Sequence, residues 1–166
     1  LPHLAFQPSE MDVDRHASIA AWVGAAHLSN VRPPLAIDVT KHPWPVDAAD
    51  AVVCINVIHI APWEAALALM AGAGTLLPVG GVLVTYGPYM RRGAHTSPSN
   101  EAFDASLRAR NPAWGVRDID ALTEVAADAG LALEEVVPMP ANNFTLVWRK
   151  SNGATSGARA LANGPA

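Results

Sequence analysis

A chain of 166 residues that is 51% hydrophobic and only 16% charged can bury one core of ordinary size, which excludes a disordered protein. The formal net charge of −4 argues against a nucleic-acid partner, and no apolar run approaches the length of a membrane span. A single cysteine, Cys54, excludes an internal disulfide, and its apolar surroundings predict a reduced core residue of a cytoplasmic protein.

Short apolar runs alternate with helical patterns along the chain. The runs that predict strands lie at residues 3–7, 34–39, 50–57, 81–86, 131–137 and 144–149. The apolar spacings that predict helices lie at residues 19–26, 63–70, 100–110 and 122–129. The last helix has Asp118 as its expected N-cap and Gly130 as its expected stop. This alternation predicts an α/β fold with a mostly parallel sheet, in which the last two strands form an antiparallel pair.

The two ends of the chain differ from its middle. The first residues, "LPHLAFQ", contain neither a starting Met nor a signal segment, so we expect a chain that is cut at its front. The last residues, Ser151 to Ala166, are small, polar and rich in glycine, which predicts a disordered tail. One domain is therefore expected over residues 1–150.

Polar side chains follow several of the predicted strands, and the carboxyl ends of strands are where open α/β sheets bind ligands. Glu10 is placed to accept hydrogen bonds from a ribose, or is a solvated loop acid. Asp38 is placed to accept from an adenine amino group, or stabilises a turn. Asn56 and His59 follow the third predicted strand, where the alternatives are a loop amide and a surface or core histidine. The six histidines show no spacing that is typical of metal ligands, so no metal site is predicted.

Common nucleotide and nucleophile motifs are missing: no Gly-x-Gly-x-x-Gly follows a strand, and no Gly-x-Ser-x-Gly or Walker loop occurs. Instead, "LLPVGGVLVTYGPY" at residues 76–89 resembles the Leu-x-Pro-Gly-Gly-x-Leu hairpin of class I S-adenosylmethionine-dependent methyltransferases. Val79 stands where the first glycine of that hairpin is usual.

Seven motifs, one of them the end of this hairpin stretch, occur in the same order as in one family of that superfamily. They are "QPSEMD", "SIAAW", "NVRPPLAIDVT", "CINVIHIAPW", "TYGPY", "SNEAFDASLRARNPAWGVRD" and "MPANNFTLVWRK". The sequence resembles the methyltransferase-like 26 family, also known as domain of unknown function 938, over residues 1–150. The resemblance implies a Rossmann-like class I methyltransferase sheet of order 3-2-1-4-5-7-6. It also implies that the first strand, the first helix and a glycine-rich loop lie upstream of Leu1, so the chain is expected to lack them.

The resemblance also implies a cofactor, S-adenosylmethionine, and a set of residues around it. Glu10 would hold the ribose, Met11 would pack beside the adenine, and Asp38 with the backbone of Val39 would contact the adenine amino edge. Asn56, Val57 and His59 would line the methionine and methyl end.

The polar segment after the strand at 81–86 is the candidate acceptor site. Its candidate substrate-binding residues are Tyr86, Tyr89, Arg108, Arg110 and Trp114. Either His95 or Asp104 is a candidate general base. The alternative is a structural network in which Arg117 and Asp118 cap a helix and Asp104 pairs with Arg108 at i, i+4.

Two kinds of function fit these patterns. One is an enzyme that transfers a methyl group to a small-molecule or protein acceptor. The other is a binding or scaffold protein that has the methyltransferase fold without turnover, since fold alone does not decide function. A nicotinamide-dependent dehydrogenase is a third, more distant reading, because the hairpin at 76–89 is not typical of that class.

Overall fold

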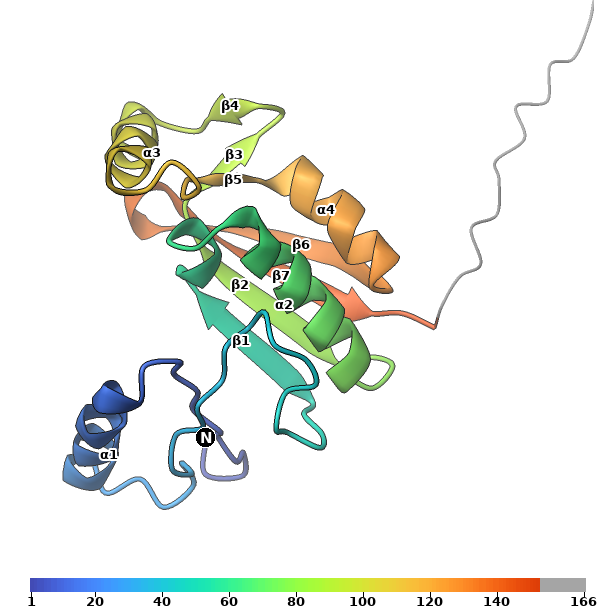
Figure 1. The fold of residues 1–166 in the computed structure, drawn as a ribbon. Coiled ribbons are helices and arrows are strands. Elements are labelled where there is room, and N and C mark those ends of the chain that lie inside the picture. Colours follow the sequence, from blue (N-terminus) through green and yellow to red (C-terminus); the bar gives the residue numbers. More distant parts are fainter. Residues whose placement is uncertain (153–166) are drawn as a thin grey trace, which may run out of the picture.

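The computed structural model describes residues 1–152, so the predicted tail lies outside the described residues except for Ser151 and Asn152. Figure 1 shows the elements in chain order. The helices are α1 (His16–Ala25), α2 (Trp63–Leu76), α3 (Pro98–Arg110) and α4 (Ile119–Asp128), with short 3-10 turns at Val13–Arg15, Val57–His59 and Pro140–Asn142. The strands are β1 (Ala51–Ile55), β2 (Val82–Gly87), β3 (Tyr89–Arg91), β4 (Ala94–His95), β5 (Arg117–Asp118), β6 (Leu131–Met139) and β7 (Asn143–Lys150).

The main sheet has four strands in the order β1-β2-β7-β6. β1 and β2 pair in parallel, and β7 is antiparallel to both of its neighbours. Three strands therefore run in one direction and only β7 runs against them, which confirms the predicted mostly parallel sheet with an antiparallel last strand. The order also matches the 4-5-7-6 half of the sheet that the resemblance implied.

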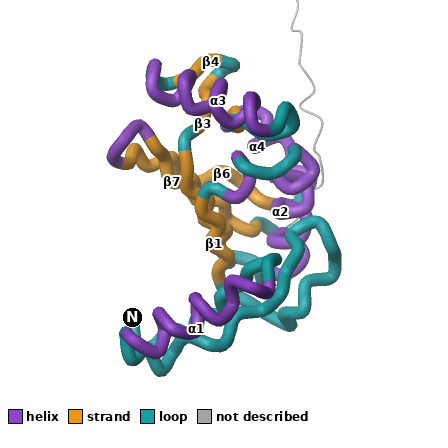
Figure 2. Tube along the Cα trace, turned by 60° about the vertical axis from the view of Figure 1, so that its left-hand side comes forward, coloured by secondary structure: helices purple, strands orange, loops and turns teal. Residues whose placement is uncertain are grey.

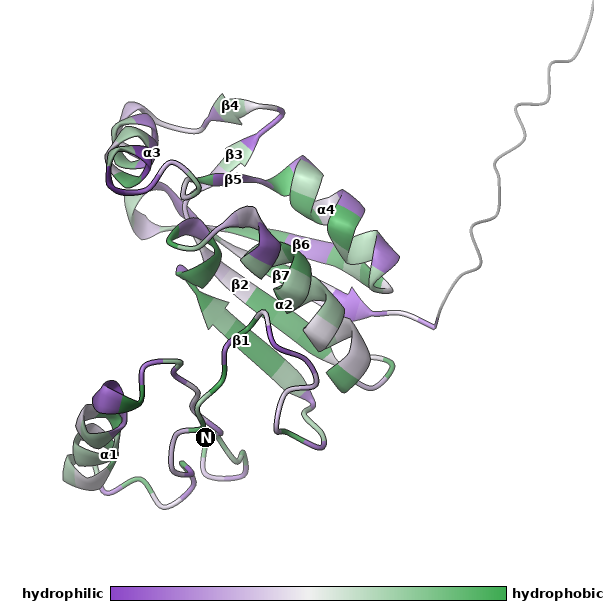
Figure 3. Ribbon diagram, viewed as in Figure 1, coloured by the Kyte–Doolittle hydropathy of each residue, from purple (hydrophilic) through white to green (hydrophobic). Residues whose placement is uncertain are grey.

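The core lies between this sheet and the helices α2 and α4. Figure 2 shows both helices on the same side of the strands. Burial alternates along β2, where Leu83 and Thr85 face the helices and are fully buried. The Thr85 hydroxyl accepts a hydrogen bond from Trp148 Nε1 at 3.1 Å, so the polar atoms of this buried pair are satisfied. The hydropathy colouring shows apolar strands at the centre of the molecule (Figure 3).

The two strands predicted at residues 3–7 and 34–39 do not form, and this prediction is wrong. In place of a ladder, two isolated parallel bridges form in and beside these segments, Phe6 to Val31 and Ser9 to Leu35. Pro8, Pro33 and Pro34 lie within or beside this pairing and have no N–H to donate, so a continuous ladder is interrupted. Neither segment pairs with β1, which leaves β1 at the edge of the sheet with Val53 62% and Ile55 60% exposed.

The helix predicted at 19–26 forms as α1, but its apolar face is not covered by other described residues. No residue of α1 is buried, and the side chain of Trp22 is 77% exposed. Figure 1 shows α1 below the sheet rather than against it. The apolar spacing therefore predicted the helix correctly, but the packing that such spacing usually indicates is not made within residues 1–152.

A small second sheet with the order β4-β3-β5 was not predicted, because its strands are only two or three residues long. Together with α3 it forms a unit above the carboxyl end of the main sheet (Figure 1), and we call residues 89–118 the cap. The Ser97 hydroxyl accepts from Asn100 N–H at the start of α3. Asp118 accepts from Asp120 N–H at the start of α4, as predicted, and α4 ends just before Gly130.

Gly74 allows α2 and α4 to approach closely. A Cβ at this position would lie 2.3 Å from the carbonyl oxygen of Ala129, which is backbone and cannot move aside cheaply. Gly24 in α1 provides a matched control, because a Cβ there would meet nothing within 4 Å.

We predict opposite effects of the same substitution at these two glycines. Gly74→Ala should lower the free energy of unfolding by about 1–3 kcal/mol through overpacking. Gly24→Ala should raise it by up to about 1 kcal/mol, because alanine is the better helix former. Urea unfolding of both variants measures the difference, and a stabilising Gly74→Ala would contradict the close approach of α2 and α4.

Candidate functional site

A row of polar side chains crosses the carboxyl ends of β1 and β2. Asn56 follows β1 with a φ of +62°, and its N–H donates to the carbonyl of Tyr86 at 2.9 Å. The Tyr86 hydroxyl accepts from Asn143 Nδ2 at 3.0 Å. Because ligands of open α/β sheets bind at this edge, these residues are a candidate ligand surface.

The row continues into the cap through Asn142. Its side-chain amide donates to Ser99 Oγ at 3.2 Å, and its carbonyl accepts from Asn100 Nδ2 at 2.9 Å. Asn142 has a φ of +59°, in a region that asparagine tolerates better than most residues. Asn142 therefore joins the sheet edge to α3.

His59 lies beneath this row and is completely buried. Its Nδ1 accepts from Arg117 N–H at 3.3 Å, so in the neutral ring Nε2 carries the proton, and Nε2 has no partner among the described residues. Burial, together with the positive charge of Arg117, lowers the pKa of His59 to about 4. His59 is therefore a neutral donor at pH 7.

Gly87 makes room for His59 and Asn56 at the same point. A Cβ at Gly87 would lie 2.5 Å from His59 Nε2 and 2.9 Å from Asn56 Oδ1. The absence of a side chain at Gly87 therefore leaves room for His59 and Asn56, two candidate methyl-end residues, at the end of β2.

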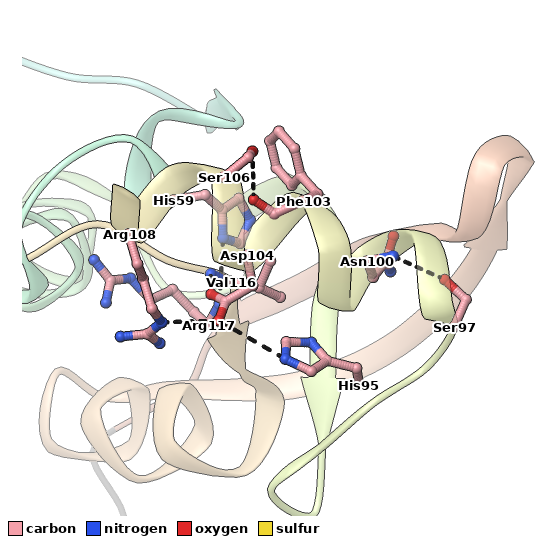
Figure 4. A network of polar contacts seen from close by, with 10 residues as sticks. All are labelled: His59, His95, Ser97, Asn100, Phe103, Asp104, Ser106, Arg108, Val116 and Arg117. Carbon is pink, nitrogen blue, oxygen red and sulfur yellow. Dashed lines mark hydrogen bonds and ion pairs between the residues drawn. The ribbon is translucent and has the colours of Figure 1, made fainter. Parts of the chain in front are cut away.

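Asp104 is the centre of a polar network in the cap (Figure 4). Its carboxylate accepts from Val116 N–H at 2.7 Å and from Arg108 Nε at 2.8 Å, and His95 Nε2 lies 3.8 Å away. Burial alone would raise the pKa of Asp104, but the hydrogen bonds from Arg108 and Val116 hold it below its usual value. His95 Nδ1 is buried and has no partner among the described residues.

Arg117 ties the cap to the end of β1. Its guanidinium donates to the carbonyls of Ile58, Ala61 and Ala113 and lies over the Trp63 ring, with its carbon 5.6 Å from the ring centroid. Of the structural network that the sequence left open as an alternative, the Asp118 cap and the Asp104–Arg108 pair are present, whereas Arg117 binds these carbonyls instead of capping a helix.

The candidate adenosine residues lie on the segment before β1. Met11 and Asp38 line one cavity of about 350 Å³, together with Ala36, Ile37, Lys41, Pro43 and Pro45. Glu10 N–H donates to Leu35 O at 3.0 Å, which holds the two extended segments side by side. One Glu10 carboxylate oxygen accepts from Asp12 N–H at 2.9 Å.

Asp38 also stabilises a turn, as its alternative reading predicted. Its carboxylate accepts from the Thr40 hydroxyl at 2.7 Å and from Thr40 N–H at 3.0 Å, and it pairs with Lys41 at 3.3 Å. The Thr40 hydrogen bonds lower the pKa of Asp38, so the group is a carboxylate at pH 7. Val39 next to it packs against the core.

The remaining candidates are spread over the cap and the core. Tyr89 is completely buried, and its ring meets the His59 ring edge-on with centroids 4.9 Å apart. Arg110 lies over Trp114 at 5.6 Å, and Val57 is 42% exposed. Sequence reasoning did not separate Tyr89 from Tyr86, because the break at Pro88 that puts them on two different strands, β2 and β3, left no pattern in the sequence.

No helix within residues 1–152 is both long and apolar enough to cross a membrane. Over the same residues, no three His, Cys, Asp or Glu side chains are grouped so that they could hold a metal ion.

The family model described as "Protein of unknown function (DUF938)" matches residues 1–150. The chain belongs to the DUF938 family. Solved structures similar to this DUF938 chain include an O-methyltransferase family protein from Burkholderia thailandensis, with a TM-score of 0.76 and 21% identity over 92% of the chain. The mitomycin 7-O-methyltransferase MmcR has a TM-score of 0.76 and 16% identity over 91% of the chain.

A third similar structure is the O-methyltransferase NcsB1 from neocarzinostatin biosynthesis, in complex with S-adenosylmethionine and 2-hydroxy-5-methyl naphthoic acid. Its TM-score is 0.70 and its identity is 16% over 89% of the chain. The DUF938 chain spans 46%, 43% and 42% of these three proteins in turn. At these identities the likeness establishes the fold: this DUF938 chain has a Rossmann-like, methyltransferase-like α/β fold.

We predict that His59 makes the DUF938 chain less stable in mild acid. The unfolded histidine binds a proton near pH 6.5, whereas the folded one does so only near pH 4, so stability falls as the pH decreases between these values. The loss approaches about 3 kcal/mol at the lower limit. Urea unfolding of the native protein and of His59→Gln at pH 7 and pH 5 isolates this contribution, because all other groups titrate in both. Equal losses in the two proteins would contradict the prediction.

Proposed function

We propose that the protein is an S-adenosylmethionine-dependent methyltransferase that acts on a small-molecule acceptor, within the methyltransferase-like 26 group that its motifs resemble. The observation that carries the proposal is the cavity lined by both Met11 and Asp38. The resemblance assigns both residues to one ligand, the adenosine, although they come from separate parts of the sequence. Their meeting in one cavity supports that assignment.

The residues around the cavity fit an adenosine in their chemistry. Met11 offers a polarisable apolar contact to a flat ring, and the Asp38 carboxylate accepts from an amino group. Glu10, on the same segment as Met11, would accept from the ribose hydroxyls. Asn56 and Val57 would hold the methionine end at the tip of β1.

Bound S-adenosylmethionine would supply an electrophilic methyl group for an in-line displacement. The chain would contribute mainly by aligning the acceptor, which can supply much of the acceleration. Tyr86, Arg108, Arg110 and Trp114 are the proposed acceptor contacts at the sheet edge and in the cap. NcsB1 binds a hydroxylated aromatic acid, which supports a small-molecule acceptor here.

If the acceptor is a hydroxyl, it must lose a proton, and His95 is the proposed base. Its Nδ1 is buried and has no partner among the described residues, so the acceptor hydroxyl would have to enter the cap beside His95 to pass it the proton. Asp104, 3.8 Å from Nε2, would stabilise the resulting imidazolium. Asp104 also accepts from Val116 N–H. It would therefore act on the reaction indirectly, through its charge and its hold on the position of His95.

Methyl transfer is tested with the full-length protein, labelled S-adenosylmethionine and a broad metabolite extract. Transfer of label to any small molecule supports the proposal. Cofactor binding without transfer would favour the alternative of a non-catalytic binding protein. Absence of cofactor binding would overturn the methyltransferase proposal.

We predict that Glu10→Ala in the full-length protein weakens S-adenosylmethionine binding by about 10- to 100-fold, because a charge-assisted hydrogen bond is lost. Glu124→Ala removes the same charge from an exposed position on α4 and should leave affinity unchanged. Titration calorimetry measures both variants. Equal affinities for the native protein and Glu10→Ala would remove Glu10 from the site.

We predict that His95→Gln lowers the turnover number by about 100-fold or more, with cofactor affinity intact, if a hydroxyl acceptor is found. Asp104→Asn should lower the turnover number and, in addition, the free energy of unfolding. Stability falls because the hydrogen bonds from Arg108 and Val116 lose their charged acceptor. Kinetics and urea unfolding of both variants separate the two roles. Unchanged turnover in His95→Gln would exclude this histidine as the base.

A further inference from the structure

The cavity that Met11 and Asp38 line is built on a part of the chain with little packing of its own. No residue between 1 and 50 is buried, and of the apolar side chains in that range only Val39 and Trp44 pack against the core. Most of the residues that line the cavity lie in the same short stretch: Asp38, Lys41, Pro43 and Pro45. The shape of the cavity therefore depends on how this stretch, the 38–45 loop, is held.

Gly72 of α2 is the point at which the core receives the 38–45 loop. Figure 1 shows the segment before β1 passing beside α2. Gly72 is buried, and a Cβ at this position would overlap Cζ2 of Trp44 and lie 2.5 Å from Cε1 of His42. The helix therefore approaches both rings so closely that no side chain fits at Gly72 without displacing them.

The two rings are not free to move aside. They are stacked on each other, with their centroids 5.3 Å apart and their planes 27° apart. The indole N–H of Trp44 donates to the Val39 carbonyl at 3.2 Å, and the half-buried ring packs against the core. Because a hydrogen bond links the indole to the backbone at Val39, displacing the indole also displaces that backbone.

Asp38 precedes Val39 and moves with it. Its carbonyl accepts from Lys41 N–H at 3.0 Å, which closes the turn. Carboxylate oxygen Oδ1 accepts from both the N–H and the hydroxyl of Thr40, and Oδ2 pairs with the Lys41 ammonium. A carboxylate has about four acceptor positions, so Oδ2 keeps one for a ligand donor. Because hydrogen bonds weaken steeply when they are misaligned, a shift of the loop would cost this contact.

A carboxylate distinguishes two purine bases that are otherwise closely similar. Adenine carries an amino group, which donates to a carboxylate. Hypoxanthine carries a carbonyl oxygen at the same position, which the carboxylate repels. A site built around such a hydrogen bond rejects the analogue that lacks the donor, because the acceptor of the site is then left unpaired.

We propose that Gly72 and Trp44 are positioning residues that hold Asp38 in line with the adenine amino group, so that they determine the selectivity of the site for adenine. The proposal rests on the proposed methyltransferase function. Neither residue is among those that line the cavity. Both act through the 38–45 loop, Trp44 by its bond to Val39 and Gly72 by leaving room for the indole.

The test compares S-adenosylhomocysteine with S-inosylhomocysteine, which differ at this one group of the base. Titration calorimetry on the full-length protein measures both affinities. We expect the native protein to prefer the adenosyl ligand by about 10- to 100-fold, the gain of a charge-assisted hydrogen bond. Gly72→Ala should reduce this preference about 10-fold, because the loop shifts. The ratio of the two affinities does not depend on the fraction of folded protein, so a loss of stability alone would not change it.

Gly74→Ala is the matched control, because it adds the same methyl group two residues along α2 but against Ala129. It should lower stability and keep the adenine preference. Trp44→Phe removes the indole N–H and should lower the preference as Gly72→Ala does. In the double variant the two losses should not add, because the alanine methyl no longer has an indole to displace. Urea unfolding shows which variants fold, and if Gly72→Ala does not, Trp44→Phe decides alone.

An unchanged adenine preference in folded Gly72→Ala or in Trp44→Phe would overturn the proposal, and so would an equal loss in Gly74→Ala. A native protein that binds both ligands with equal affinity would overturn the positioning role while cofactor binding stands. A native protein that binds neither ligand would overturn the methyltransferase function and, with it, the role of Gly72 and Trp44.

Discussion

The site depends first on the half-buried guanidinium of Arg117. This one group donates to carbonyls on both sides of the join between sheet and cap: Ile58 and Ala61 after β1, and Ala113 before β5. The backbone N–H of Arg117 donates to Nδ1 of His59 and so fixes the orientation of that ring. The guanidinium donors are bound by carbonyls and not by a carboxylate, so no paired negative charge offsets the positive charge of Arg117. That positive charge helps to keep His59 neutral.

This arrangement explains why the cap lies where it does. With the turn at residues 57–61 tied to residues 113–117, α3 is held above the carboxyl end of the sheet, and Asn100 and Ser99 reach Asn142 on the β6–β7 connection. The cap therefore closes over β1, β2 and β7 from two sides. A site at this edge would be built from rigid elements, which suits a reaction that depends on positioning.

Much of the fold could be predicted from the sequence because its signals are local. The apolar runs of β1 and β2, the caps at Asp118 and Gly130, and the short join between β6 and β7 each indicate an element without knowledge of its neighbours. The strands expected at residues 3–7 and 34–39 failed because a strand also needs a continuous partner, and Pro8, Pro33 and Pro34 interrupt the pairing there. The strands of the small sheet were too short to give a pattern.

The site was harder to predict, because a polar residue looks the same in sequence whether it serves a ligand or the fold. Arg117, Arg108 and Arg91 all occur in one polar stretch, yet the first binds carbonyls, the second binds Asp104, and the third makes no side-chain hydrogen bond within residues 1–152. Tyr86 and Tyr89 are three residues apart, but one borders the edge and the other lies in the core. Only the packing separates these roles.

The central claim is that the segment carrying Glu10, Met11 and Asp38 and the tip of β1 at Asn56 hold two ends of one ligand. A crystal structure of the full-length protein with S-adenosylhomocysteine tests it most directly. The account predicts the adenine between Met11 and Asp38, the ribose hydroxyls on Glu10, and the sulfur beside Asn56 and Val57. An ordered ligand that binds elsewhere, or a saturated crystal in which this cavity holds no ligand, would contradict it.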